Sequence, residues 1–239
     1  MSIFTPRISG KKELSLANAL VHEGKLEEAM EMAKTALVEI RTSGKSKEII
    51  STNARVVEIQ GIYHEHEGNL DAASAAYGQA AKFYLQSEMN GEFQRVQKKH
   101  AELLLDVGRN HAANKAFDSA ASSFEEAAIS YKLINREIDA VEAKAKAFVF
   151  RAASVRNPPD RKRFLMRAVD LIRESGINHP LVFGHLEYYT ALVQRISSPE
   201  LALTSLKRAY THYKTADSKA MQKTVQAMVR SLQKEINQL

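Results

Sequence analysis

The chain has 239 residues, of which 44% are hydrophobic and 26% are charged, and its formal net charge is +6. This composition is typical of a folded, water-soluble protein that can bury a substantial core. The absence of cysteine excludes a disulfide framework, a thiol nucleophile and a thiolate metal site. The sequence shows neither a secretory signal pattern nor a run of about 18 apolar residues, so we expect a cytoplasmic protein without a membrane span.

Residues 1–9 contain Pro6 and lack helical periodicity, which predicts a flexible N-terminal lead-in. Within it, Ile3 and Phe4 are expected to pack over the first helix pair, with docking on a partner or a membrane as the alternative. From residue 10 to residue 215, apolar side chains recur at helical spacing between turn signals. This region predicts five helix pairs, at about 10–41, 47–86, 92–134, 136–174 and 180–214.

Prolines and glycines mark several of these helix boundaries. Pro158, Pro180 and Pro199 each follow a polar residue, a pattern that predicts proline at the first position of a helix. Asn90 and Gly91 predict the end of the second pair. Residues 216–239 predict a last helix with apolar residues on one side, which would cap the exposed end of the repeats. No segment alternates as a strand does, so the expected fold class is all-α.

An internal repeat organises the chain. The second helix of each pair carries a small–large–small stripe that recurs every 41–47 residues. The stripes are Ala29/Ala33/Ala36, Ala73/Tyr77/Ala80, Ala120/Phe124/Ala127, Arg161/Leu165/Ala168 and Ala202/Leu206/Ala209. The facing positions on the first helices are Ala17, Gly61, Gly108, Val149 and Thr190. Small residues at three of these five positions would let the paired helix axes approach closely.

These stripes, with the turn glycines Gly24 and Gly68, resemble the tetratricopeptide repeat (TPR) family. The chain lacks the family's frequent tryptophan in the first helix and its proline after the second, and its period exceeds the usual ~34 residues. Longer helices of this kind resemble the soluble NSF-attachment protein family. The resemblance implies a right-handed α-solenoid of about five antiparallel helix pairs that binds other proteins and is not an enzyme.

The sequence offers no supported catalytic or metal site. His64 and His66 flank Glu65, but side chains two residues apart on a helix point in nearly opposite directions and cannot share one metal ion. The remaining histidines, His185 among them, stand apart from carboxylates at helical ligand spacings. Glycine-rich nucleotide-binding motifs are also missing. We therefore expect no cofactor and no bound metal.

Partner recognition is expected on the concave face, which the first helices would line. By the repeat register Tyr188 faces this groove and its neighbour Tyr189 packs between helices, because adjacent helical residues diverge by about 100°. Core packing of both tyrosines is the alternative and the commoner outcome. A basic patch between residues 151 and 167 offers a second surface. The predicted partner-binding residues are Asn18, Arg55, Glu58, Arg109, Lys146, Phe150, Tyr188 and Arg195 on the concave face, and Arg161, Lys162 and Arg163 on the basic patch.

These features favour a protein–protein adaptor that holds a partner helix or an acidic protein surface. The alternative is binding of nucleic acid or an anionic membrane surface through the basic residues. Nucleic acid is disfavoured because aromatic residues are not interleaved with the basic ones. Peripheral membrane contact stays open, as does the choice between a monomer and a homodimer formed through the end helices.

Overall fold

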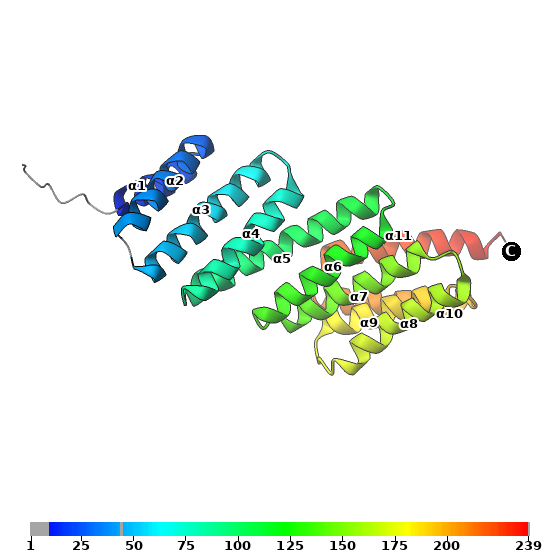
Figure 1. Cartoon of the computed structure of the whole chain (residues 1–239). Coiled ribbons are helices and arrows are strands. Elements are labelled where there is room, and N and C mark those ends of the chain that lie inside the picture. The colour runs from blue at the N-terminus through cyan, green and yellow to red at the C-terminus, as the bar shows by residue number, and fades with distance from the viewer. Residues whose placement is uncertain (1–9, 44, 239) are drawn as a thin grey trace, which may run out of the picture. The chain divides into compact units, whose positions relative to one another are not determined.

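The computed structural model describes residues 10–43 and 45–238, and every regular element within them is an α-helix. The all-α prediction is therefore confirmed. The predicted lead-in at residues 1–9, with Ile3 and Phe4, lies outside the described residues. The helices (Figure 1) are α1 (Lys11–His22), α2 (Leu26–Ser43), α3 (Ser46–His66), α4 (Leu70–Gln86), α5 (Asn90–Ala113), α6 (Phe117–Leu133), α7 (Glu137–Ser154), α8 (Pro158–Glu174), α9 (Pro180–Gln194), α10 (Pro199–Thr215) and α11 (Lys219–Ile236).

Most helix boundaries follow the turn residues of the sequence. Gly24 and Gly68 have φ values of 76° and 74°, in the left-handed region that glycine adopts without steric cost. Pro158, Pro180 and Pro199 each begin a helix, as predicted. At this position proline costs no hydrogen bond, because the first amides of a helix have no partner within it.

One predicted boundary is wrong. Asn90 and Gly91 form the first turn of α5 and do not end the second pair. The turn before them is made by Glu88, which has a φ of 59° although it is not glycine. The amide of Met89 donates to the carbonyl of Tyr84 at 2.9 Å and closes α4. The predicted end of the second pair at residue 86 is correct, but a glutamate in the left-handed region gives no signal in the sequence, so the turn was assigned to the wrong residues.

The chain divides into two compact units after Val107, within α5. In the first unit, α1 packs on α2, α2 on α3 and α3 on α4. In the second unit, each helix from α6 to α11 packs on the next helix in the sequence. Within each unit the helices therefore stack in chain order as antiparallel neighbours, which is the arrangement of a helical-repeat solenoid.

Small residues lie in the seams between paired helices. A Cβ atom added to Gly61 would lie 3.1 Å from the ring of Tyr77, and one added to Gly108 would lie 2.9 Å from the ring of Phe124. Each glycine thus lets an aromatic ring of the next helix rest against the backbone. The alanines that close the five stripes are completely buried: Ala36, Ala80, Ala127, Ala168 and Ala209.

The predicted register is incorrect in parts of the last two pairs. Arg161, placed in the fourth stripe, is exposed, and its guanidinium donates to the carbonyl of Val155 at 3.5 Å. Thr190, predicted to face the seam of the fifth pair, is only partly buried. The close approach occurs instead at Gly184 of α9, where an added Cβ would lie 2.7 Å from the ring of Tyr213. Six residues separate the predicted contact from the observed one.

The last helix, α11, packs on α10 through one side. Val225 and Leu232 are fully buried, in a core cluster that includes Ala209 and Tyr213. Met228 and other apolar residues at the edge of this contact are partly buried. None of the helices in the described ranges is long and apolar enough to cross a membrane.

Candidate partner-binding groove

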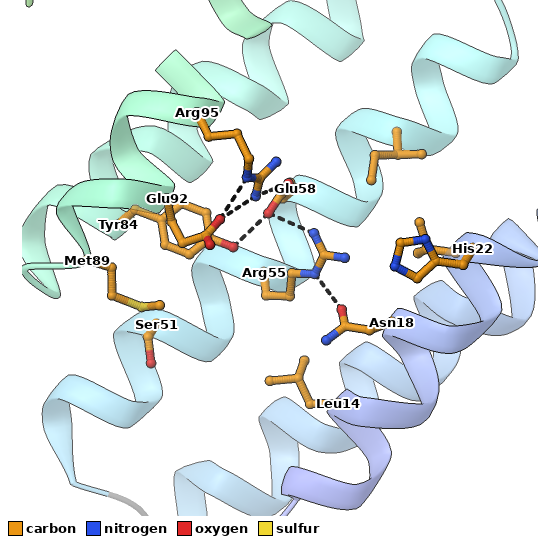
Figure 2. A pocket seen from close by; sticks show the side chains of 12 residues that line it. Leu14, Asn18, His22, Ser51, Arg55, Glu58, Tyr84, Met89, Glu92 and Arg95 are labelled. Atoms are coloured by element: carbon orange, nitrogen blue, oxygen red, sulfur yellow. Dashed lines mark hydrogen bonds and ion pairs between the residues drawn. The ribbon is translucent and has the colours of Figure 1, made fainter. Parts of the chain in front are cut away.

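The first unit contains a groove of about 650 Å³ that collects several of the predicted partner-binding residues (Figure 2). It lies between α1, α3 and the start of α5, with Tyr84 of α4 at its base. The predicted concave positions of the first two pairs meet here, including Asn18, Arg55 and Glu58. The full lining is Leu14, Asn18, Val21, His22, Ser51, Arg55, Glu58, Ile62, Tyr84, Met89, Glu92 and Arg95.

Glu58 is the centre of an ionic cluster at the base of this groove, which we call the Glu58 cluster (Glu58, Arg55, Tyr84 and Arg95). Its side chain is 1% exposed. One carboxylate oxygen accepts from Arg55 Nη1 at 2.9 Å and from the hydroxyl of Tyr84 at 2.7 Å. The other oxygen accepts from Arg95 Nη2 at 2.6 Å. The cluster therefore joins α3, α4 and α5 through a single carboxylate.

The cluster sets the charge state of its members. Burial by itself would raise the pKa of Glu58, but the positive charge of Arg55, the Tyr84 hydrogen bond and the charge of Arg95 together lower this pKa below its ordinary value. Burial and the nearby Glu58 charge raise the pKa of Tyr84. Glu58 is therefore ionised and Tyr84 is neutral at physiological pH, which keeps all their hydrogen bonds formed.

Arg55 is held in place but still has a free donor. Its Nε donates to Asn18 Oδ1 at 2.6 Å and its Nη1 to Glu58, so both α1 and α3 fix the guanidinium. Within the described part of the chain, its Nη2 makes no hydrogen bond, and neither does the amide nitrogen of Asn18. The Arg55 side chain is 19% exposed. The groove thus presents preorganised donors beside the apolar side chains of Leu14 and Ile62.

A second cluster repeats this geometry two helical turns further along α3. Glu65 accepts from the hydroxyl of Tyr77 at 3.2 Å and from Lys99 Nζ at 2.6 Å. Again a carboxylate of α3 joins a tyrosine of α4 to a cation of α5. The sequence contains a signal for both clusters, because Glu58 and Glu65 are seven residues apart, as are the two tyrosines. We did not predict either cluster, since pairing these rows requires the order in which the helices pack.

The predicted concave residues of the second unit are mostly engaged in packing. Lys146 donates to Glu142 at 2.6 Å. The ring of Phe150 stacks on that of Phe124, with centroids 5.2 Å apart, and also faces Phe117. Tyr188 is partly buried against the apolar core. Tyr189 is 3% exposed, which confirms that it packs between helices.

The other predicted residues lie near the surface. Arg195 is paired with Glu235 of α11 at 2.5 Å, and Arg109 is exposed at the end of α5. Arg161, Lys162 and Arg163 are all exposed in the first turns of α8. Arg163 lies 3.3 Å from Asp160, so one of these three charges is partly neutralised.

A buried histidine network in the second unit was not predicted. His185 of α9 is 2% exposed, and its Nδ1 lies 2.8 Å from the hydroxyl of Tyr213. Its Nε2 lies 3.3 Å from Glu142 of α7, too poorly aligned for a hydrogen bond. Burial would raise the pKa of Glu142, but His185 and Lys146 outweigh that effect and lower it to about 2. Glu142 is 43 positions from His185 in the sequence, so only the packing of α7 on α9 brings them together.

The histidines that stand closest together in the sequence do not form a metal site. The ring of His64 packs edge-on to Tyr63, and His66 is exposed beside Glu67. Among the residues that the structure describes, no three metal-ligating side chains come together.

Comparisons with known proteins found only low similarity. The sequence matches no family model, and no curated protein matches it. Three solved structures align over nearly the whole chain. A putative kinesin light chain with TPR-like repeats from Podosopora anserina is 12% identical, covering 96% of each chain with a TM-score of 0.35.

Two further solved structures are similar at the same level. The TPR2AB domain of yeast Sti1, in complex with an HSP90 peptide, is 16% identical, with 95% of this chain and 86% of that chain covered and a TM-score of 0.30. A tetratricopeptide repeat protein from Parabacteroides merdae is 14% identical, with 94% and 99% covered and a TM-score of 0.26. Because all three scores are low, the repeat architecture rests on the helix packing described above.

Proposed function

We propose that this protein is a non-enzymatic adaptor that binds a partner protein in the groove of the first unit. The observation that carries this proposal is the state of Arg55, which Asn18 and Glu58 fix while its Nη2 stays free. A fixed guanidinium loses little conformational entropy when it donates a hydrogen bond to a partner, so binding there is favoured. The apolar side chains of Leu14 and Ile62 provide the desolvated surroundings in which such a bond is strongest.

A helical segment of the partner is the occupant that best fits this groove. Its lining combines apolar, polar and charged side chains, which suits the apolar stripe and polar flank of an amphipathic helix. The likeness to the soluble NSF-attachment proteins suggests a second mode, in which Arg161, Lys162 and Arg163 grip an acidic helical bundle. Their exposure on α8 supports this basic-patch mode. A cytoplasmic location accompanies either mode as part of the proposal.

The test is a pull-down from cell lysate with four forms of the full chain. They are the wild type, Arg55→Gln, the triple reversal of Arg161, Lys162 and Arg163 to Glu, and the control Arg173→Gln, which changes an arginine on the exposed face of α8. Groove binding predicts that Arg55→Gln loses partners that the other variants retain. Loss with the triple reversal alone would assign the partner to the basic patch. Retention of every partner by both variants contradicts the adaptor proposal.

Salt dependence separates protein partners from nucleic acid or an anionic membrane. Binding to nucleic acid releases counterions and falls by orders of magnitude between about 50 and 200 mM salt. Binding in a partly apolar groove should fall by less than about tenfold over the same range. A steep loss, abolished by the triple reversal, would favour the alternative function.

A further inference from the structure

The second unit has an apolar groove of its own, distant in sequence from the groove of the first unit. It has a volume of about 610 Å³ and lies between α6, the first half of α7 and the end of α8. Its floor is aliphatic, formed by partly buried side chains that pack on the core below, including Val141, Leu171 and Ile177. We call it the α6–α8 groove.

One wall of the α6–α8 groove carries exposed aliphatic side chains. Ile129 of α6 lines the groove and is 61% exposed, and Leu133, one helical turn further, is 58% exposed. Residues four positions apart lie on the same side of a helix, so these two form one continuous apolar row. A row that extends past the groove fits a polypeptide segment better than a compact small molecule.

Two lysines flank this apolar surface on opposite walls. Lys132 of α6 is exposed, and its amino group makes no hydrogen bond or ion pair with the residues that the structure describes. Lys144 of α7 lies 3.9 Å from Glu125, whose carboxylate already accepts from Arg151 at 2.6 Å. Glu137 is the one acid in the lining. The rim therefore has a positive excess that an acidic partner would complement.

From this juxtaposition we infer that the α6–α8 groove is a second docking site, which binds a short protein segment with aliphatic side chains next to aspartate or glutamate. The aliphatic side chains would cover Ile129 and Leu133, and the carboxylates would pair with Lys132 and Lys144. Aromatic rings that could stack on bases do not line the groove, which disfavours a single-stranded nucleic acid. The site shares no lining residue with the groove of the first unit, which we call the Arg55 groove.

The test is a selection of displayed random peptides on the full-length chain, followed by affinity measurements with the enriched peptides. The expected peptides combine Leu or Ile with Asp or Glu. Ile129→Glu should weaken their binding by about tenfold or more, because it places a like charge in the apolar row. The matched control is Leu201→Glu, which alters an aliphatic residue of α10 that is 56% exposed and leaves affinity unchanged.

A charge reversal gives the sharper result. The double variant Lys132→Glu and Lys144→Glu should select basic in place of acidic peptides, whereas Lys223→Glu, an exposed lysine on α11, should select the same peptides as the wild type. Circular dichroism confirms that each variant is folded. The inference is overturned if the enriched peptides lack acids, if Ile129→Glu binds them as tightly, or if no peptide is enriched.

Two other occupants of the groove are distinguished by further measurements on the same variants. If a second copy of this chain covers the groove, size-exclusion chromatography shows a dimer that Ile129→Glu dissociates. If a lipid surface covers it, vesicles with anionic headgroups bind the wild type and release it on the Lys132 and Lys144 reversal. Either result would show that something other than a short protein segment occupies the groove, and would overturn the inference.

Discussion

The two units hold their helices together by different means. In the first unit, the carboxylates of Glu58 and Glu65 on α3 each join a tyrosine of α4 to a cation of α5. In the second unit, the rings of Phe117, Phe124 and Phe150 stack between helices, and the imidazole of His185 meets Tyr213. The Glu58 cluster of the first unit places charged side chains along a groove, whereas the stacked rings of the second unit fill the space between helices.

The difference supports our proposal that a partner binds in the groove of the first unit. An aromatic stack contributes packing energy but has few donors or acceptors to offer. A carboxylate that holds two guanidinium groups leaves some of their N–H groups directed elsewhere, since an arginine has five donors and a carboxylate cannot accept all of them. The groove of the first unit therefore keeps free N–H donors, as our proposal requires. In the second unit, the docking site that we infer lies along the apolar row of Ile129 and Leu133 on α6.

The largest expected loss of stability is that of Glu58→Ala in the first unit. The change leaves Arg55 and the hydroxyl of Tyr84 without their shared acceptor in a buried place. The free energy of unfolding should fall by about 3 kcal/mol. Glu65→Ala should cost about 1 kcal/mol, because the Glu65 and Lys99 side chains are 33% and 38% exposed and solvent replaces the lost contact.

Urea denaturation followed by circular dichroism measures both values, and hydrogen exchange shows whether the lost protection is confined to the first unit. Glu126→Ala, which removes an exposed acid of α6, is the control and should change stability by less than about 0.5 kcal/mol. If Glu58→Ala were as mild as this control, the carboxylate would not be what joins these helices.

An intermediate loss of stability is expected where an aromatic ring packs on a glycine. Gly184→Ala would bring a Cβ to 2.7 Å from the ring of Tyr213, which is fully buried and hydrogen-bonded, so it should cost about 2 kcal/mol. Gly61→Ala approaches the Tyr77 ring at 3.1 Å, and the gain in helix propensity of about 1 kcal/mol should nearly offset the strain.

The matched control for these two variants is Gly91→Ala, since nothing lies within 4 Å of a Cβ at Gly91 in α5. It should stabilise the protein slightly, by about 0.5–1 kcal/mol. Thermal melts rank the three variants. Equal stability of the Gly184 and Gly91 variants would show that Tyr213 moves away without cost, and that the second unit is less tightly packed than its buried rings indicate.

The smallest expected effect is a dependence of the free energy of unfolding on pH, which arises in the first unit. Burial, with the charge of Lys82 as a further cause, lowers the pKa of His100 to about 4. The unfolded chain binds a proton at His100 below an ordinary pKa of about 6.5, whereas the folded chain does so only near 4, so stability decreases as the pH falls through this window. We expect a loss of about 1 kcal/mol, because the imidazole is not completely buried.

The measurement is the slope of unfolding free energy against pH, compared between the wild type and His100→Gln. The substitution should flatten the slope between about pH 6.5 and 4. His66→Gln, at an imidazole that is 72% exposed, should leave the slope as in the wild type. A slope unchanged by His100→Gln would contradict the assignment of this window to His100.

Residue spacing predicted some features of the fold correctly and others incorrectly. The alanine stripes and the helix-starting prolines were predicted because helical periodicity and proline geometry act over a few residues. Arg161 was placed in a seam by the same spacing, wrongly, because period alone does not tell whether a position is covered by another helix. The end of α4 at Gln86 was predicted, but the turn after it was assigned to Asn90 and Gly91 and not to Glu88, because glutamate has no preference for the left-handed region that would mark it.

The candidate site was predicted in part. Asn18, Arg55 and Glu58 were assigned to one face, and the structure brings them together in one groove. The role of Glu58 as the shared acceptor of two arginines and a tyrosine was missed, because Tyr84 and Arg95 lie on other helices. The pairing of Glu142 with His185 was missed for the same reason, since neither residue stands near the other along a helix.

By itself, the sequence determined the helical class, the repeat with its buried alanines and the absence of cysteine chemistry. These properties follow from composition and from contacts between residues on one helix or on a pair joined by a short turn. Only the tertiary structure decided which charges are buried, which arginine has a free donor and which aliphatic row stays uncovered. Burial and charge pairing depend on distances between separate helices, and these are set by the packing of side chains across each seam.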